Sequence, residues 1–343
     1  MTGPSSRGDQ SVPPAAVVPG SSAVGFVPWQ EAWQQALYGP DGFYRSSEGP
    51  AGHFRTAAHA APGPLARALA RLAAEADCAG VVDVGAGRGE LVCALAEAAP
   101  ALALHAVDLV PRPPGLAAGI GWSCGLDASA RNALRTGRVL LVAWELLDVV
   151  PGPILEIDED GVPRELLVQP GTGRERPGPA AAEDDLEWCR RWWPLEGAEP
   201  GTRAEVGRPR DLLWQELLGL LGEGLALTVD YRHTLDDRPA EGSLTGFRVG
   251  RQVPPVPNGT MDLTTHVALD SVAAAGIRAG ATTSRLTTQR EALRELGVGT
   301  PDPQVTRLEQ LVEASRSAEL LARGGFGDFG WLVQTVRRTP GRG

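Results

Sequence analysis

A glycine-rich segment around residue 85 constrains the fold of this chain more than any other feature. Residues 81–84 are apolar and β-branched apart from one acid, which predicts a short buried strand. Glycines then alternate with other residues, and from residue 91 onward apolar residues recur at helical spacing. A strand, a glycine turn and a helix form the first half of a nucleotide-binding βαβ unit. The segment therefore predicts an α/β fold.

The charges beside the glycines narrow the choice of ligand. A dinucleotide loop reads Gly-x-Gly-x-x-Gly and places a helix N-terminus against a pyrophosphate. Here the loop reads Gly-x-Gly-x-Gly, with Asp83 before it and Glu90 directly after it. Two carboxylates would repel a pyrophosphate but suit S-adenosylmethionine (SAM), which carries an ammonium and a sulfonium. A purely structural glycine turn is the alternative, because a glycine motif alone has low specificity.

Two acids after the next strands extend this prediction. A strand at 102–107 ends in Asp108, which lies 23 residues after Gly85, about where a ribose-binding carboxylate is expected. A short strand at 120–124 precedes Asp127. Asp127 is placed either to reach an adenine amino group or to cap the helix that follows.

Polar residues also follow two later strands that read as buried. The strand at 139–144 leads into Glu145 and Asp148, and the strand at 225–229 leads into Asp230 and His233. Ligands of open α/β sheets bind at the carboxyl ends of strands, so these four side chains are candidates for catalysis. Helix capping is the alternative role for Glu145 and Asp148, and a structural hydrogen bond is the alternative for His233.

The pattern along the chain predicts one domain with a flexible tail and an insertion. Residues 1–24 are rich in Pro, Ser, Gly and Ala and have no apolar period, which is typical of a disordered tail. Residues 25–343 then form a single domain, with an inserted cap at about 153–222. The cap is predicted to contain a hairpin at 153–168, a loop at 170–182 and helices at 183–193 and 209–222. Its tryptophans indicate either a cap core or a surface for a partner.

Composition excludes several classes of partner. The formal charge of −10 argues against a nucleic-acid backbone or an anionic membrane as the main partner. No apolar run approaches the length of a membrane span, and the N-terminus lacks the apolar core of a signal peptide. The four cysteines have no Cys-x-x-Cys spacing, so we expect reduced thiols in a cytoplasmic protein, without a disulfide framework or a metal site.

An ordered set of segments resembles a known family. The set covers Tyr-Gly-Pro-Asp-Gly-Phe-Tyr at 38–44, Gly-His-Phe-Arg-Thr at 52–56, the glycine loop, Trp-Glu at 144–145 through Pro151, Val-Asp-Tyr at 229–231, Gly-Phe-Arg at 246–248, Asp-Leu-Thr-Thr-His-Val at 262–267 and Leu-Thr-Thr-Gln-Arg-Glu at 286–291. From about residue 33 to 336, the chain resembles the MidA-like SAM-dependent methyltransferases, which are relatives of the mitochondrial complex I assembly methyltransferase.

This resemblance implies a class I methyltransferase (Rossmann-like) sheet with an inserted hairpin and helical cap, and SAM as cofactor. The acceptor would be a protein side chain, with arginine favoured, and a homodimer is compatible with the resemblance. By motif, the methionine part of SAM would be held by Asp83, Gly85, Gly87 and Gly89. Asp108 matches the acid that binds the ribose, Thr56 the threonine that closes over the site, and Glu145 and Asp148 the acids after the fourth strand.

A guanidinium acceptor needs a carboxylate that orients the cation and takes up its proton. Glu145, which would also border the cofactor, is the first candidate. Asp148 or Asp230 is second and His233 third.

Three positions depart from the family pattern and bear on catalysis rather than on SAM binding. Trp144 stands where the family has Asn, Arg232 where it has Gly, and Ala268 where it has an acid. These departures keep open a second hypothesis, a non-catalytic SAM-binding assembly factor that grips a partner protein. An NAD-dependent oxidoreductase is a third hypothesis, which Glu90 and the glycine spacing disfavour.

Overall fold

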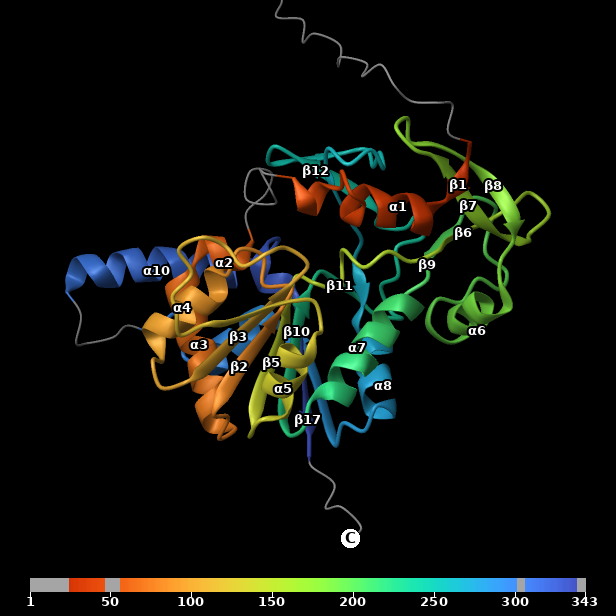
Figure 1. The fold of residues 1–343 in the computed structure, drawn as a ribbon. Coiled ribbons are helices and arrows are strands. Elements are labelled where there is room, and N and C mark those ends of the chain that lie inside the picture. The colour runs from red at the N-terminus through yellow and green to blue at the C-terminus, as the bar shows by residue number, and fades with distance from the viewer. Residues whose placement is uncertain (1–24, 47–55, 301–305, 338–343) are drawn as a thin grey trace, which may run out of the picture.

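A seven-stranded mixed sheet forms the centre of the computed structural model, which describes residues 25–46, 56–300 and 306–337 (Figure 1). The strands run in the order β16-β17-β10-β5-β2-β3-β4, and β17 lies antiparallel between β10 and β16. Their bounds are β2 (Gly80–Val84), β3 (Ala103–Asp108), β4 (Gly121–Cys124), β5 (Val139–Trp144), β10 (Gly224–Asp230), β16 (Thr283–Thr288) and β17 (Gly330–Val336). This arrangement confirms the predicted α/β fold of the class I methyltransferases.

The strand order locates the ligand crevice. From β2 the chain proceeds outward through β3 and β4, and it then returns to place β5 and β10 on the other side of β2. All residues of β2 and β5 are buried, as expected for parallel strands that are covered on both faces. The order therefore reverses between β2 and β5, and ligands of open α/β sheets bind at the carboxyl ends of strands at such a point.

Helices cover both faces of the central sheet. One face is covered by α3 (Pro62–Glu75), α4 (Glu90–Ala98), α9 (Gln289–Glu295) and α10 (Arg307–Leu321). The other is covered by α5 (Ala128–Arg135), α7 (Arg208–Leu220) and α8 (Leu269–Arg278). Successive side chains of a strand point to opposite faces of the sheet and so into different cores. In β2, Val81 packs into the first core and Val82 into the second.

The insertion contains the predicted hairpin within a second sheet. Strands β6 (Ile154–Ile157) and β7 (Pro163–Gln169) pair antiparallel, which confirms the hairpin. The sheet is completed by β1 (Val27–Pro28), β9 (Arg203–Glu205) and β8 (Arg174–Ala180), and α1 (Trp29–Tyr38) packs on it. The prediction of a loop at 170–182 is therefore wrong for residues 174–180, which form β8. Strand β8 pairs only with β7 among the described strands, and such an edge position tolerates Pro177 and Pro179.

The helical part of the cap packs differently from the sequence-based prediction. Helix α6 (Glu183–Trp192) buries Trp188 against β6 and β9, and Trp193 just after it lies in the same core, which favours the cap-core role of these tryptophans. Helix α7, assigned to the cap from the sequence, instead buries Trp214 in the core of the central sheet. The Trp188 indole Nε1 donates to Asp211 Oδ2 of α7 at 2.9 Å, which ties the cap to the sheet layer.

Smaller elements close the carboxyl end of the central sheet. Strands β12 (Thr245–Arg248), β13 (Arg251–Val253) and β14 (Asp262–Thr264) form a three-stranded sheet that lies with α1 over this end (Figure 1). A two-stranded sheet pairs β11 (Arg232–His233) with β15 (Val267–Ala268). The short helices are η1 (Phe43–Arg45), α2 (Ala57–Ala60) and η3 (Phe326–Asp328).

The remaining predictions concern the N-terminal tail, membrane-spanning helices and the cysteines. The predicted tail at 1–24 and most of the Gly-His-Phe-Arg-Thr segment, before Thr56, lie outside the described residues. Within the described ranges, no helix combines the length and hydropathy that a membrane crossing requires. All four cysteines are free, and two of them, Cys78 and Cys189, are buried.

Candidate functional site

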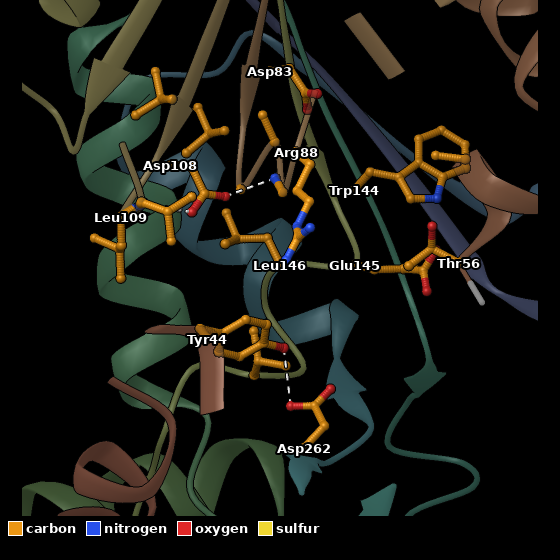
Figure 2. A pocket seen from close by; sticks show the side chains of 18 of the residues that line it. Tyr44, Thr56, Asp83, Arg88, Asp108, Leu109, Trp144, Glu145, Leu146 and Asp262 are labelled. Atoms are coloured by element: carbon orange, nitrogen blue, oxygen red, sulfur yellow. Dashed lines mark hydrogen bonds between the residues drawn. The ribbon is translucent and has the colours of Figure 1, made fainter. Parts of the chain in front are cut away.

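A cavity of about 1070 Å³ lies at the carboxyl ends of β2, β3 and β5 (Figure 2). Its wall combines the glycine loop, the ends of β3 and β5, and residues from α1, η1, β12 and β14. Most small-molecule pockets measure roughly 300–1,000 Å³. The cavity therefore has room for a cofactor together with the reacting group of a second substrate.

The glycine loop forms one end of this cavity. Gly85, Gly87 and Gly89 have φ angles of 80°, 60° and 85°, a backbone region that a Cβ disfavours. Gly85 and Gly87 line the cavity, whereas Gly89 is the N-cap of α4 and lies behind the wall. A Cβ at Gly85 would also approach Leu146 Cδ1 to 2.8 Å. The loop thus brings its backbone, rather than side chains, toward a ligand.

Carboxylates surround the loop as the sequence predicts. The Gly87 N–H donates to Asp108 Oδ2 at 2.7 Å, so the acid at the end of β3 is joined to the loop. Asp83 is 2 % exposed and lines the cavity, and its burial, together with the charges of Asp108 and Glu90, raises its pKa to about 7. A glycine cradle beside these acids fits a cofactor that has a cationic amino-acid end and a ribose.

Asp127 serves as a helix cap. Its Oδ1 accepts hydrogen bonds from the Ala130 N–H at 2.9 Å and from the Ser123 hydroxyl at 2.8 Å. The side chain is outside the cavity wall, which the preceding Gly125 and Leu126 line instead. The structure thus supports the capping alternative for Asp127.

Glu145 occupies a strained position in the cavity wall. It follows the last residue of β5 with a φ of 50°, which is uncommon for a residue other than glycine and recurs at functional sites. Its Oε1 accepts a hydrogen bond from the Ala57 N–H at 3.0 Å. Burial raises the pKa of Glu145 to about 7 despite this bond. The structure therefore holds a carboxyl group that can change its protonation near neutral pH.

Thr56 and helix α2 cover the glycine loop. Thr56 lines the cavity and caps α2, and its Oγ1 lies 2.7 Å from His59 Nδ1. His59 Nε2 lies 3.2 Å from Glu90 Oε1, next to the loop. The segment thus contacts the glycine loop through Glu90 and the end of β5 through Glu145, a position consistent with the predicted closing role of Thr56.

Two more acids and a tyrosine form the other end of the cavity. Asp148 is 4 % exposed and Asp262 is 1 % exposed, and each has one oxygen without a hydrogen-bond partner among the described residues. The Tyr44 hydroxyl donates to the other Asp262 oxygen at 3.0 Å (Figure 2). Burial raises the pKa of Asp262 to about 7, and burial together with the charge of Asp230 raises that of Asp148 well above its usual range. We assign no role to Asp262 or Tyr44 from the sequence, although both lie in family-like segments.

The structure does not bring Asp230 and His233 to the cavity wall. Asp230 is fully buried, and its Oδ2 accepts the N–H groups of Leu147 and Asp148. The His233 ring packs edge-on against Trp193, with a centroid distance of 4.8 Å, and it contacts Arg238. Burial and the charge of Arg238 lower the pKa of His233 to about 3, so its ring is neutral. Asp230 and His233 therefore hold structural positions outside the cavity, rather than the catalytic positions that the sequence predicts.

Of the three family departures, only Trp144 lines the cavity. Its ring packs edge-to-face on Trp331, with a centroid distance of 5.6 Å. Arg232 lies beside Gly330 at the end of the sheet, and Ala268 is buried with the cap tryptophans. Neither Arg232 nor Ala268 is among the residues that line the cavity.

Comparisons with known proteins agree with this geometry. Two crystal structures of a COG1565 superfamily protein from Burkholderia thailandensis, one of them bound to S-adenosyl-homocysteine, are similar to this chain. In each case the TM-score is 0.74 at 23% identity, over 92% of this chain and 89% of the other, which shows a common fold. No curated protein matches the sequence. Residues 95–287, more than half of the chain, match a family model, and the chain therefore belongs to that family of S-adenosyl-L-methionine-dependent methyltransferases.

Proposed function

We propose that this methyltransferase acts in the manner of the MidA-like enzymes and methylates an arginine side chain of a protein, with Glu145 as the catalytic carboxylate. A protein partner and a cytoplasmic location belong to the same proposal. The observation that carries it is a second group of acids in the cavity wall. Glu145, Asp148 and Asp262 line the cavity in addition to Asp83, Glu90 and Asp108, which lie beside the glycine loop.

SAM is the methyl donor of this family. When bound, it supplies a methyl group on a sulfonium, which is open to in-line displacement. In our proposal the backbone at Gly85 and Gly87 approaches the methionine part, and Asp83 faces its ammonium. Asp108 accepts from the ribose hydroxyls, because a carboxylate that already accepts backbone N–H groups retains further acceptor sites.

Glu145 suits a cationic acceptor in charge and in protonation. Methylation of a guanidinium forms a nitrogen–carbon bond, breaks the carbon–sulfur bond and releases a proton from that nitrogen. A carboxylate orients the planar cation through paired hydrogen bonds and then accepts the proton. General bases are most effective when their pKa lies near the working pH, and burial places the pKa of Glu145 at about 7. The pKa of His233, at about 3, is far below this range.

The first test combines labelling with one substitution. Purified protein and methyl-labelled SAM are incubated with cell extract, and the labelled proteins are hydrolysed to identify the modified residue. We expect label on arginine. Glu145→Gln should lower the transfer rate by about 100-fold or more, the usual contribution of a general base. It should change the calorimetric SAM affinity only a few-fold, because the glycine loop and Asp108 are untouched.

The control is Glu156→Gln, which alters a carboxylate that pairs with Arg203 in the second sheet, away from the cavity. It should keep both rate and affinity. Label on another residue type would refute the arginine acceptor. Loss of SAM binding in Glu145→Gln would refute the role assigned to Glu145. A protein that binds SAM and labels nothing would be an assembly factor, the alternative that Trp144 in the cavity wall favours.

A further inference from the structure

We infer that Asp230 and Arg210 are positioning residues for methyl transfer, and that they act through Glu145 by holding the backbone of residues 145–148 from two sides. The inference deepens the proposed function, since it rests on Glu145 as the catalytic carboxylate. Both side chains are buried and neither lines the cavity, so we assign them no direct contact with the substrate or the cofactor. Their effect has to pass through the loop that carries Glu145.

Asp230 holds the N–H side of this loop. It ends β10, next to β5, and is fully buried. Its Oδ2 accepts the N–H groups of Leu147 at 2.9 Å and of Asp148 at 3.2 Å, and its Oδ1 accepts the N–H of Tyr231 at 3.0 Å. One carboxylate therefore satisfies consecutive amides that have left the strand ladder, and buried amides of this kind need a partner.

Arg210 holds the carbonyl side of this loop. This α7 side chain is 2 % exposed, and its Nε donates to the Leu147 carbonyl at 2.9 Å. Its Nη2 donates to Thr265 Oγ1 at 2.6 Å, and the Thr265 N–H donates to the Asp148 carbonyl at 3.1 Å. Arg210 thus grips the loop both directly and through Thr265.

The strained backbone of Glu145 explains why such a grip matters. A residue other than glycine persists at a φ of 50° only where its surroundings hold it there. The Glu145 N–H is fixed by the Val229 carbonyl at 2.8 Å, and the bonds to Leu147 and Asp148 fix the chain just beyond it. If the hydrogen bonds to Leu147 and Asp148 were lost, the backbone of Glu145 could leave its strained conformation. Its carboxylate would then lose the hydrogen bond from the Ala57 N–H.

The charge of Arg210 and its shape have separable effects. Its guanidinium lies among carboxylates that include Glu205, Asp230 and Asp148, so removing the charge would leave them unbalanced. Arg210→Lys keeps the charge, but a single ammonium on a flexible stem cannot reproduce the planar fork that joins Leu147 to Thr265. This variant therefore isolates the positioning role from the electrostatic one.

The test compares four variants. Arg210→Lys and Asp230→Ala loosen the loop, and Asp230→Asn restores an oxygen acceptor at the same place. Asp211→Asn is the matched control, because Asp211 is also buried and also lies among the carboxylates around the Arg210 guanidinium, but its hydrogen bonds go to Trp188 and Ser271 rather than to residues 145–148. For each variant we measure the transfer rate with labelled SAM, the SAM concentration at half-maximal rate, the affinity for S-adenosylhomocysteine, and the hydrogen exchange of residues 145–151.

We expect Arg210→Lys and Asp230→Ala to lower the maximal rate about 10-fold or more, while the half-maximal SAM concentration and the S-adenosylhomocysteine affinity stay within about threefold. Exchange at 145–151 should accelerate in both. Asp230→Asn should recover most of the rate, and Asp211→Asn should keep rate and exchange despite a lower melting temperature. These directions follow because only the first two variants remove bonds to the loop.

Three results would overturn the inference: an unchanged rate in Arg210→Lys, unchanged exchange at 145–151, or an equal loss in Asp211→Asn. If Asp230→Ala does not fold, Arg210→Lys still decides between the outcomes. If the native protein transfers no methyl group, the proposed function fails. The exchange and S-adenosylhomocysteine measurements then still show whether these two residues hold the loop.

Discussion

At the scale of single residues, the charge of Asp262 raises the pKa of Glu145, although the two residues are far apart in the sequence. It comes from β14 and occupies, with Tyr44, the opposite end of the cavity from Asp83 (Figure 2). Burial is the main cause of the raised pKa of Glu145, and the charge of Asp262 raises it further. The protonation of Glu145, the proposed catalytic carboxylate, therefore depends on an acid more than 100 residues away.

Asp262→Asn should shift the pH dependence of methyl transfer. A base works when deprotonated, so the rate should fall as the pH drops through the pKa of Glu145, at about 7. Removing the charge of Asp262 lowers that pKa, so the acidic limb of the rate profile should move to lower pH. Rates measured between pH 5.5 and 8.5, a range chosen to span about 7, check this. Glu156→Gln, which removes a carboxylate of the second sheet away from the cavity, is the control, and a limb that stays in place in Asp262→Asn would contradict the prediction.

Site residues could be predicted where local sequence determines their place. Asp83, Gly85, Gly87 and Asp108 follow directly from a strand and its turn, and the structure places all four in the cavity wall. Asp230 also ends a strand, but its carboxylate turns to the backbone beside it rather than into the cavity. Strand position alone does not decide such a direction, because successive side chains point to opposite faces.

At the scale of elements, periodicity predicted helices better than their packing partners. The apolar stripe of α7 indicates a buried face but not the surface that buries it, and the sheet rather than the cap does so. Strand β8 escaped prediction because proline and glycine suggest a loop until an edge position is known. Tyr44 and Arg210 make their hydrogen bonds to segments that are distant in the sequence. The residues next to them in the chain therefore do not predict these contacts.

The tie between the cap and the sheet layer should stabilise the fold without affecting ligand binding. The Trp188 indole donates to Asp211, which also accepts from the Ser271 hydroxyl, so α6, α7 and α8 meet at one buried carboxylate. Trp188→Phe removes one donor to a buried charge and should cost about 1.5–3 kcal/mol. A thermal melt should show the loss, and calorimetry with S-adenosylhomocysteine should show unchanged affinity. A melting temperature equal to that of the native protein would contradict this role.

At the scale of the whole molecule, buried acids should make stability depend on pH. The folded chain raises the pKa of Asp83, Glu145 and Asp262 to about 7 and also raises the pKa values of Asp148 and Asp230, mainly through burial. A raised acid binds its proton more tightly when folded, so its contribution to stability is lost as the pH rises through these values. Histidines with lowered pKa, such as His233, act in the opposite direction only below about pH 6.5.

We therefore expect the melting temperature of the protein without cofactor to fall by several degrees between about pH 6.5 and pH 8.5. Asp262→Asn should flatten the fall, because it removes one of these buried acids. Thermal melts in matched ionic strength provide the measurement. A melting temperature that rises over this interval would show that the buried acids do not control the titration.

The contacts of helix α1 have a consequence for the order in which the cavity forms. The Trp33 indole donates to the Leu263 carbonyl, 230 positions later in the chain, and the Tyr38 hydroxyl donates to the Val149 carbonyl. Pairings so distant in sequence are slow to form, since a long loop must close first. The pairings of β2 with β3 and with β5 join residues that all lie between positions 80 and 142, so these contacts can form before α1 reaches its place. We therefore expect the end of the cavity at the glycine loop to form before the end at Tyr44 and Asp262.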